Sequence, residues 1–224
     1  RDIAYSLIEE LGANQDKIFC IPTELTEESA CKEAIQKTIE TTGRLDYLIH
    51  NAGTNDGVGL DSPTEDFFNS LRKNLVHVFA LTHYSLDELV HNQGAVINIG
   101  SKVAETGQGG TSGYAASKGA MNALTREWAL DLADKGVRVN AVIPAEVMTP
   151  MYQRWLDTLE SPGKTLASIE ENIPFGKRMT TDREIADAVV FLASPRSSHT
   201  TGQIFYPDGG YAHLDRSYGK IQLD

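Results

Sequence analysis

The chain has 224 residues, enough for one domain with a buried core, and its hydrophobic fraction of 41% is ordinary for a globular protein. Its formal net charge of −11 argues against nucleic acid or an anionic membrane surface as a partner. No apolar run has transmembrane length and no signal peptide opens the sequence, so we expect a cytoplasmic protein. The two cysteines, Cys20 and Cys31, are too few for a disulfide framework and lack metal-ligand spacing, which predicts reduced thiols and no metal site.

The first fifty residues alternate between helical and strand-like patterns. Apolar residues at helical spacing predict a helix over residues 1–11, and the short apolar run at 17–22 predicts a buried strand. Capping residues at 26–28 open a helix that Gly43 ends, and a strand follows over residues 44–50. Near-continuous apolar strands that alternate with helices predict a parallel sheet with helices on both faces.

The same alternation continues to the end of the chain. Helices are expected from Pro63 and over 71–90, 112–134 and 182–191, and strands over 95–99, 137–143 and 199–206. Residues 148–173 carry apolar side chains at helical spacing, which is typical of a core stripe. In a fold of this kind, however, we expect the segment to lie over the site as a substrate lid.

The stretch from Ser101 to Lys118 carries the chemistry. An apolar strand precedes it and a Gly-rich loop lies within it. The helix that follows the loop places Tyr114 and Lys118 four residues apart, on one face. A lysine held close to a tyrosine favours the phenolate and lowers the pKa of the phenol from its usual value near ~10. Such a phenol is a usable general acid and base, and Ser101 offers a hydroxyl for a substrate oxygen. The Tyr-x-x-x-Lys pair alone also occurs by chance on ordinary helices.

With the preceding strand and Ser101 at the matching spacing, this stretch resembles the short-chain dehydrogenase/reductase family. The resemblance implies a single Rossmann-like domain over residues 1–224, a doubly wound parallel sheet in three α/β/α layers, and an NAD(P)-dependent oxidoreductase acting on CH–OH groups. It implies that Tyr114 is the acid/base, that Ser101 holds the forming carbonyl oxygen, and that Lys118 binds the nicotinamide ribose. Asn74, in the family's pattern, holds a water that relays protons to Lys118.

The resemblance also implies a set of coenzyme-binding residues. One group lies at an adenine-side position and at the end of the strand over 44–50, where His50 departs from the usual Asn. A second group follows the strand over 137–143, where Ala145 replaces the usual Gly, and would hold the nicotinamide carboxamide. The implied set is Glu24, Leu25, Asn51, Ala52, Gly53, Tyr114, Lys118, Pro144, Ala145, Val147 and Thr149.

The family's opening strand and its Gly-rich T-G-x-x-x-G-x-G turn have no counterpart in this sequence. That unit holds the pyrophosphate at a helix N-terminus. We therefore expect the sequence to be part of a longer protein that contains at least one further βαβ unit. The alternative is a variant that does not hold the coenzyme normally. The residue that separates NAD from NADP lies in the same unit, and NAD is slightly favoured.

Several strings resemble a bacterial sugar-oxidising branch of the family, that of L-fucose dehydrogenases; one is I-P-A-E-V-M-T-P-M-Y from Ile143. The expected reaction is oxidation of an aldose such as L-fucose at C1 to a lactone, with hydride passing to C4 of the nicotinamide. Glu146 is either a hydroxyl acceptor for the sugar or a solvent-facing loop charge. The candidate substrate residues are Ser101, Asn55, Gln108, Glu146, Trp155 and His213, the last with a plain surface role as its alternative.

Two other functions stay open from the residues. A carbonyl reductase or hydroxy-lipid dehydrogenase would use the same site, and a catalytically silent scaffold would use the fold without coenzyme. Small residues along the helix over 112–134 suit packing on the sheet and also close approach between subunits. The family's assembly through this helix implies a homodimer or homotetramer.

Overall fold

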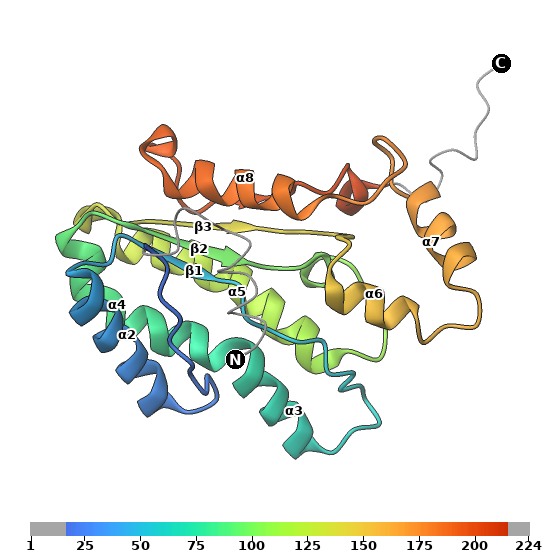
Figure 1. Cartoon of the computed structure of the whole chain (residues 1–224), viewed down its shortest axis with the longest axis horizontal. Helices are drawn as coiled ribbons and strands as arrows, with labels where there is room; N and C mark the ends of the chain where they lie inside the picture. Colours follow the sequence, from blue (N-terminus) through green and yellow to red (C-terminus); the bar gives the residue numbers. More distant parts are fainter. Residues whose placement is uncertain (1–16, 215–224) are drawn as a thin grey trace.

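The computed structural model describes residues 17–214, and the helix predicted over residues 1–11 lies outside them. Its centre is a parallel sheet, as the sequence predicts, and the strands lie in the order β1-β2-β3-β4 (Figure 1). Each neighbouring pair runs parallel, and Ile99 at the end of β2 faces Val142 at the end of β3. The strands are β1 (Tyr47–His50), β2 (Ala95–Ile99), β3 (Arg138–Val142) and β4 (Ile204–Phe205).

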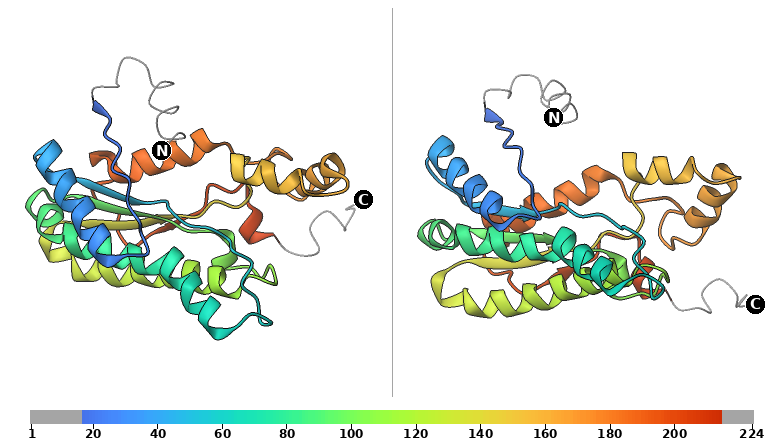
Figure 2. Two further views of the ribbon diagram at one scale, coloured as in Figure 1. Left: turned by 60° about the horizontal axis from the view of Figure 1, so that its bottom comes forward. Right: turned by 90° about the horizontal axis from the view of Figure 1, so that it is seen from below.

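Helices cover both faces of the sheet. On one face α4 and α5 contact the strands and α2 packs on α4, while α8 packs on β2 and β3 from the opposite side (Figure 1). α6 and α7 lie together beyond the carboxyl end of β3, as the turned views show (Figure 2). The helices are α2 (Glu28–Thr42), α3 (Thr64–Leu71), α4 (His77–His91), α5 (Ser112–Asp131), α6 (Pro150–Leu156), α7 (Pro162–Glu171) and α8 (Asp182–Ala193).

The central strands are buried on both faces, which explains their continuous apolar sequence. All five residues of β2 are buried, and successive side chains point to opposite faces. Val96 joins the core beneath α4 and α5, whereas Ile97 joins the core beneath α8. A strand enclosed in this way carries apolar side chains on both faces. The polar exceptions, Asn98 and Asn140, are buried and donate to Thr125 and to the Thr200 carbonyl.

The helix that carries Asn74 contains a π-helical turn. α3 continues into a π turn (Arg72–Val76) and then into α4 without a break. Such single-turn widenings inside α-helices are rare and are frequent at functional sites. The sequence predicts helix on both sides of Asn74 but gives no sign of this turn.

The prediction of a strand over residues 17–22 is wrong. These residues have no strand beside them in the part of the chain that the structure describes, and β1 forms the edge of the sheet. A strand exists only through its ladder of hydrogen bonds with a neighbour. Phe19 within this segment is 55% exposed, so the apolar run is not part of the described core.

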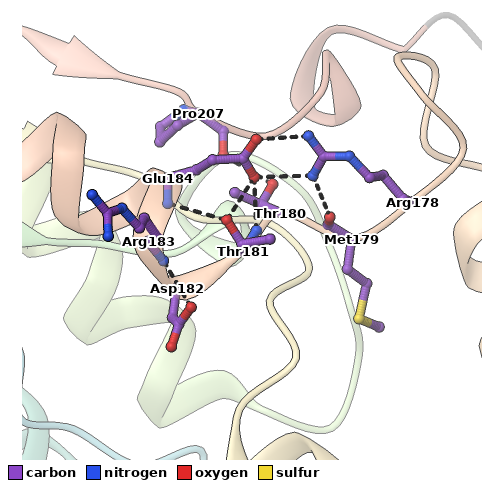
Figure 3. A network of polar contacts seen from close by, with 8 residues as sticks. All are labelled: Arg178, Met179, Thr180, Thr181, Asp182, Arg183, Glu184 and Pro207. Carbon is purple, nitrogen blue, oxygen red and sulfur yellow. Dashed lines mark hydrogen bonds and ion pairs between the residues drawn. The ribbon is translucent and has the colours of Figure 1, made fainter.

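Residues 148–173 form two short helices rather than one continuous stripe. α6 buries Leu156, while α7 has no buried residue. The segment that follows is tied to the start of α8 by the polar network in Figure 3. Arg178 pairs with Glu184, which also completes a capping box with Thr181, and Thr180 donates to the Pro207 carbonyl. The chain after α7 is therefore fixed where it rejoins the sheet.

No helix in residues 17–214 combines the length and apolar character needed to cross a bilayer.

Candidate active site

The carboxyl ends of β2 and β3 bring the predicted reactive residues together. Ser101 follows β2 after Gly100 and caps a short 3-10 turn (Lys102–Ala104), where its Oγ accepts from the Val103 N–H at 3.4 Å. The helix α5 begins at Ser112 and carries Tyr114 and Lys118 on successive turns. Open α/β sheets bind ligands at this edge of the strands.

Ser101 and Tyr114 lie within hydrogen-bonding reach of each other. Burial raises the pKa of the Tyr114 phenol, and a hydrogen bond from the Ser101 side chain opposes that rise. The net direction is upward from the usual value of 10.0. A buried phenol that keeps its proton can donate to a carbonyl oxygen, and in the reverse direction it must first lose that proton.

The prediction that Lys118 lowers the pKa of Tyr114 is therefore wrong. Lys118 Nζ lies 5.6 Å from the centre of the Tyr114 ring and donates to the Ile99 carbonyl at 2.7 Å. The ammonium group is thus directed to the end of β2 and not to the phenol oxygen. Burial is the larger influence on the phenol in this arrangement.

Lys118 is itself strongly affected by its surroundings. It is 3% exposed, and burial lowers its pKa from 10.5 to about 8. An ammonium removed from water loses solvation, which favours the neutral amine. Lys118 can therefore gain and lose a proton near physiological pH, which suits a group that exchanges protons with a neighbour.

Asn74 is fully buried inside the π turn, and its amide is held at both ends. Its Oδ1 accepts from the Thr54 N–H at 2.7 Å, and its Nδ2 donates to the Ser70 carbonyl at 3.0 Å. A Cβ added at Gly53 would lie 3.1 Å from Asn74 Oδ1 and 3.6 Å from Lys118 Nζ. The strand end at Gly53, the amide and the ammonium group thus meet around one small space that a side chain at Gly53 would fill.

Three residues of the expected coenzyme set directly follow β1. Asn51, Ala52 and Gly53 are exposed where β1 ends, so their backbone is open to a ligand. Glu24 is also exposed, and its carboxylate accepts from the Thr26 N–H and hydroxyl, while Leu25 is half-buried.

The group after β3 is held by its neighbours. Val147 forms a bridge with Thr180, and Thr149 Oγ1 caps α6 by accepting from the Tyr152 N–H at 3.1 Å. Pro144 and Ala145 are half-buried between that bridge and β3. The nicotinamide end of a dinucleotide would suit this arrangement. It offers exposed backbone at Gly53 after β1, the buried cation Lys118 and a fixed loop after β3.

Glu146 is buried rather than solvent-facing. Its carboxylate forms an ion pair with Lys102, and its other oxygen accepts from the Tyr152 hydroxyl at 2.8 Å. Lys102 Nζ also lies 4.4 Å from the centre of the Tyr211 ring. Burial lowers the pKa of Lys102 and raises that of Tyr152. The sequence marks Glu146 as unusual but does not reveal Lys102, because the two partners are far apart in the chain.

The other predicted substrate residues are more open. Asn55 and Gln108 are exposed, and Asn55 Oδ1 accepts from the Gly57 N–H. Trp155 is 46% exposed, with its ring 5.2 Å from Tyr152. His213 is exposed, and its ring lies 5.4 Å from Tyr206. None of these four shares the burial of Glu146.

A second buried polar group, which sequence reasoning did not identify as a group, lies behind the end of β1. His50 is 3% exposed, and its Nε2 lies 2.9 Å from Thr82 Oγ1 on α4. Burial lowers the His50 pKa to about 3, and the charges of His77 and Lys118 act in the same direction. His50 is therefore neutral at physiological pH. His50 stands where the family usually has Asn, and Thr82 provides the hydrogen-bond partner for its ring.

Comparison with known proteins identifies the family. A family model described as Enoyl-(Acyl carrier protein) reductase matches residues 2–212. This chain belongs to the short-chain dehydrogenase/reductase family. Its relatives carry the names of dehydrogenases and reductases, and the chain is an NAD(P)-dependent oxidoreductase. The scaffold alternative has no support from these relatives.

Two relatives and one solved structure illustrate the range of similar proteins. A 3-oxoacyl-(acyl-carrier-protein) reductase FabG of Thermotoga maritima is 34% identical over 92% of this chain and 81% of its own. An L-fucose dehydrogenase of Rattus norvegicus is 34% identical over 89% of this chain and 73% of its own. The crystal structure of Cj0485 dehydrogenase matches 91% of this chain and 78% of its own, with 42% identity and a TM-score of 0.86.

Proposed function

We propose that this protein oxidises an aldose such as L-fucose at C1 to a lactone, with NAD or NADP as the coenzyme. The observation that carries the proposal is the cluster of Asn74, Ser101, Tyr114 and Lys118 at the carboxyl edge of the sheet, which we call the catalytic cluster. It combines a phenol, a hydroxyl beside it and a buried ammonium group of low pKa. That combination suits proton transfer between the phenol and a substrate oxygen, and removal of a proton from an alcohol requires that Tyr114 first lose its own.

Each member of the catalytic cluster has a proposed role. Tyr114, in its phenolate form, accepts the proton of the C1 hydroxyl, and Ser101 donates a hydrogen bond to the oxygen as it becomes a carbonyl. Lys118, whose pKa is about 8, passes protons to and from the buried space that it shares with Asn74 and Gly53. Asn74 is held rigidly by Thr54 and Ser70, so it can orient a water in that space.

The coenzyme would be held at the nicotinamide end by Gly53, Lys118, Val147 and Thr149. When bound, the nicotinamide supplies the acceptor for the hydrogen and electron pair that leave the sugar carbon. Lys118 Nζ would lie 3.6 Å from a Cβ added at Gly53, which supports the proposal that it donates to a ribose hydroxyl. Of the two coenzymes we expect NAD slightly more than NADP, as in the sequence analysis.

Two observations support a sugar rather than another alcohol. The substrate side of the site contains the buried carboxylate of Glu146, together with Lys102 and Tyr152, which suits a ligand with several hydroxyl groups. An L-fucose dehydrogenase is among the relatives at 34% identity. A purely apolar substrate would not use the hydrogen-bonding sites that this ion pair leaves open and would cover them without replacing their contacts with water.

A carbonyl reductase is the second candidate. A relative named 3-oxoacyl-(acyl-carrier-protein) reductase is as similar to this chain as the L-fucose dehydrogenase, at 34% identity. The catalytic cluster would serve that reaction equally well in the reductive direction, with Tyr114 donating its proton.

We also propose that the protein is cytoplasmic, that residues 148–173 act as a lid, and that the chain assembles as a homodimer or homotetramer through α4 and α5. Phe79 on α4 is 57% exposed and Leu130 on α5 is 80% exposed. Between the two helices lies a cleft of about 360 Å³ that contains Phe79, Leu86 and Trp128. Burying these side chains against the same face of a second copy removes apolar surface from water.

The test of this function is turnover by the full-length protein. Formation of reduced nicotinamide is followed with NAD and NADP in turn, against a panel of aldoses, simple secondary alcohols and, in the reverse direction, a 3-oxoacyl thioester. Turnover of aldoses above the other two classes is expected. Turnover of the thioester alone would favour the reductase and overturn the sugar proposal.

A further inference from the structure

Four separate segments of the chain meet around one buried ion pair beside Ser101. Lys102 comes from the turn after β2, Glu146 from the loop after β3, Tyr152 from α6 and Tyr211 from a 3-10 turn (Tyr211–His213). We call these four residues the recognition cluster. The side chains of the ion pair are 15% and 8% exposed, for Lys102 and Glu146 respectively.

The position of the pair follows from the sheet. Lys102 is the residue after Ser101, and its N–H donates to the Pro144 carbonyl at 3.0 Å, which joins the ends of β2 and β3. Glu146 comes two residues after Pro144, and its own carbonyl accepts from the Thr180 N–H at 3.0 Å. The backbone of both partners is therefore fixed at the carboxyl edge of the sheet, next to the catalytic cluster.

Burying such a pair is costly for a purely structural role. A carboxylate and an ammonium group both lose solvation, and a well-packed apolar pair of the same size is often as stable or more stable. The lid helix α6 already contributes the apolar side chain of Leu156 to the interior. The charges therefore need a reason beyond holding α6 in place.

Lys102 and Glu146 also have donor and acceptor sites that their mutual contact does not use. An ammonium group has three donors, and a carboxylate has about four acceptor sites. In the described part of the chain, Lys102 uses one donor on Glu146, while Glu146 accepts from Lys102 and Tyr152. A neighbouring pair of hydroxyls can use what is left, because one hydroxyl accepts from the ammonium group while the other donates to the carboxylate.

We propose that Lys102 and Glu146 together bind two neighbouring hydroxyl groups of the substrate, with Tyr152 and Tyr211 positioning them. This inference rests on the proposed aldose oxidation and names the part of the site that recognises the sugar. The ligand class is a compound with vicinal hydroxyls next to the reacting carbon. Tyr152 orients the carboxylate through its hydroxyl, and the face of Tyr211 lies against the ammonium group, an attraction between a cation and a ring.

The test compares substrates that differ by one hydroxyl. The kcat/KM is measured for the aldose that the unmodified protein turns over fastest, for its deoxy derivatives that each lack one ring hydroxyl, and for a simple secondary alcohol. The main variant is Lys102→Met/Glu146→Gln, which removes both charges and so leaves no unpaired buried ion. An ion pair at the opposite edge of the sheet, changed as Arg44→Gln/Asp46→Asn, serves as the matched control.

The double variant is expected to lose roughly 10- to 100-fold in kcat/KM for the full aldose, since hydrogen bonds to charged groups are lost. It should lose little for the secondary alcohol. For the deoxy derivative that lacks a contacted hydroxyl, the unmodified protein should already show most of that loss, and the variant should add little to it. The control variant should match the unmodified protein on all substrates.

Tyr152→Phe provides a second measurement if the double variant does not fold. It removes one hydroxyl, and a several-fold rise in KM for the aldose with unchanged kcat/KM for the secondary alcohol is expected. An equal loss on aldose, deoxy derivatives and secondary alcohol, in either variant, would overturn the inference while leaving aldose oxidation intact. Failure of the unmodified protein to turn over any aldose would overturn the proposed function, and this inference with it.

Discussion

The two halves of the site are built in different ways. The catalytic cluster lies at the turn after β2, on the first turns of α5 and in the π turn before α4. Backbone groups hold its buried members, Asn74 and Lys118. The recognition cluster is assembled from loops and short helices and is held by contacts between side chains. Backbone contacts survive most changes of sequence, whereas side-chain contacts change with each substitution. With the proposed roles, the reacting groups belong to the scaffold and substrate choice belongs to the loops.

The largest expected effect is that of Lys118→Met. Removing the ammonium group should lower kcat by about 10²- to 10⁴-fold, the usual contribution of acid/base catalysis. The same change should stabilise the protein by about 3 kcal/mol at pH 7, because a shift of the Lys118 pKa from 10.5 to about 8 measures the cost of burying its charge. Urea unfolding with a parallel rate assay checks both results.

The pH dependence of that stability separates this account from simple repacking. The unfolded chain binds more protons than the folded one between pH 8 and 10.5, so the destabilisation is fully present below about pH 8 and disappears as the pH rises towards 10.5. The gain from Lys118→Met should shrink over the same window. A gain that does not change with pH would show that packing, not charge, is responsible.

The next effect concerns His50→Asn and acid stability. The folded-state pKa of His50 is about 3, below its unfolded value of 6.5, so the unfolded state binds more protons in between. The folded protein should lose up to about 3 kcal/mol through this group as the pH falls from 6.5 to 4. The variant should lose correspondingly less, as measured by urea unfolding at the two pH values. Identical pH dependence in both proteins would rule out His50 as the cause.

Asn74→Ala should have a smaller effect on stability, of about 1–3 kcal/mol, because the Thr54 N–H is left without its acceptor. If Asn74 supports proton exchange at Lys118, kcat for alcohol oxidation should also fall. The fall should be larger at low pH than at high pH, because oxidation releases a proton and low pH opposes that release. Asn74→Asp keeps an oxygen acceptor for Thr54 and serves as the control. A fall in kcat that is the same at every pH would indicate a structural role only.

The smallest effect is expected at the network in Figure 3, outside both clusters. Thr181→Ala removes the capping hydroxyl at the start of α8 and should cost about 1 kcal/mol. Thermal unfolding measures it, and the conservative change Thr181→Ser should restore most of the loss. The kcat/KM should stay unchanged for every substrate. A change in substrate preference would mean that this network also belongs to the recognition half.

The sequence predicts the catalytic half better than the recognition half, and the reason is physical. Tyr114 and Lys118 share one helix face, and Ser101 follows a strand, so local spacing is enough to bring them together. The pairing of Lys102 with Glu146 depends on how two strand ends and a loop meet, which no local pattern records. The π turn around Asn74 also has no local sequence signal. The apolar residues in 17–22 do not form a strand, because a strand needs a neighbouring strand to pair with.

In the proposed mechanism, Tyr114 is the proton acceptor of the catalytic cluster. The most direct measurement compares the unmodified protein with Tyr114→Phe, each assayed on L-fucose and on a simple secondary alcohol with NAD and NADP, with coenzyme binding followed by fluorescence. The account predicts turnover by the unmodified protein, a loss of at least about 10²-fold on both substrates in the variant, and nearly unchanged coenzyme affinity. Retained turnover by Tyr114→Phe would contradict the account.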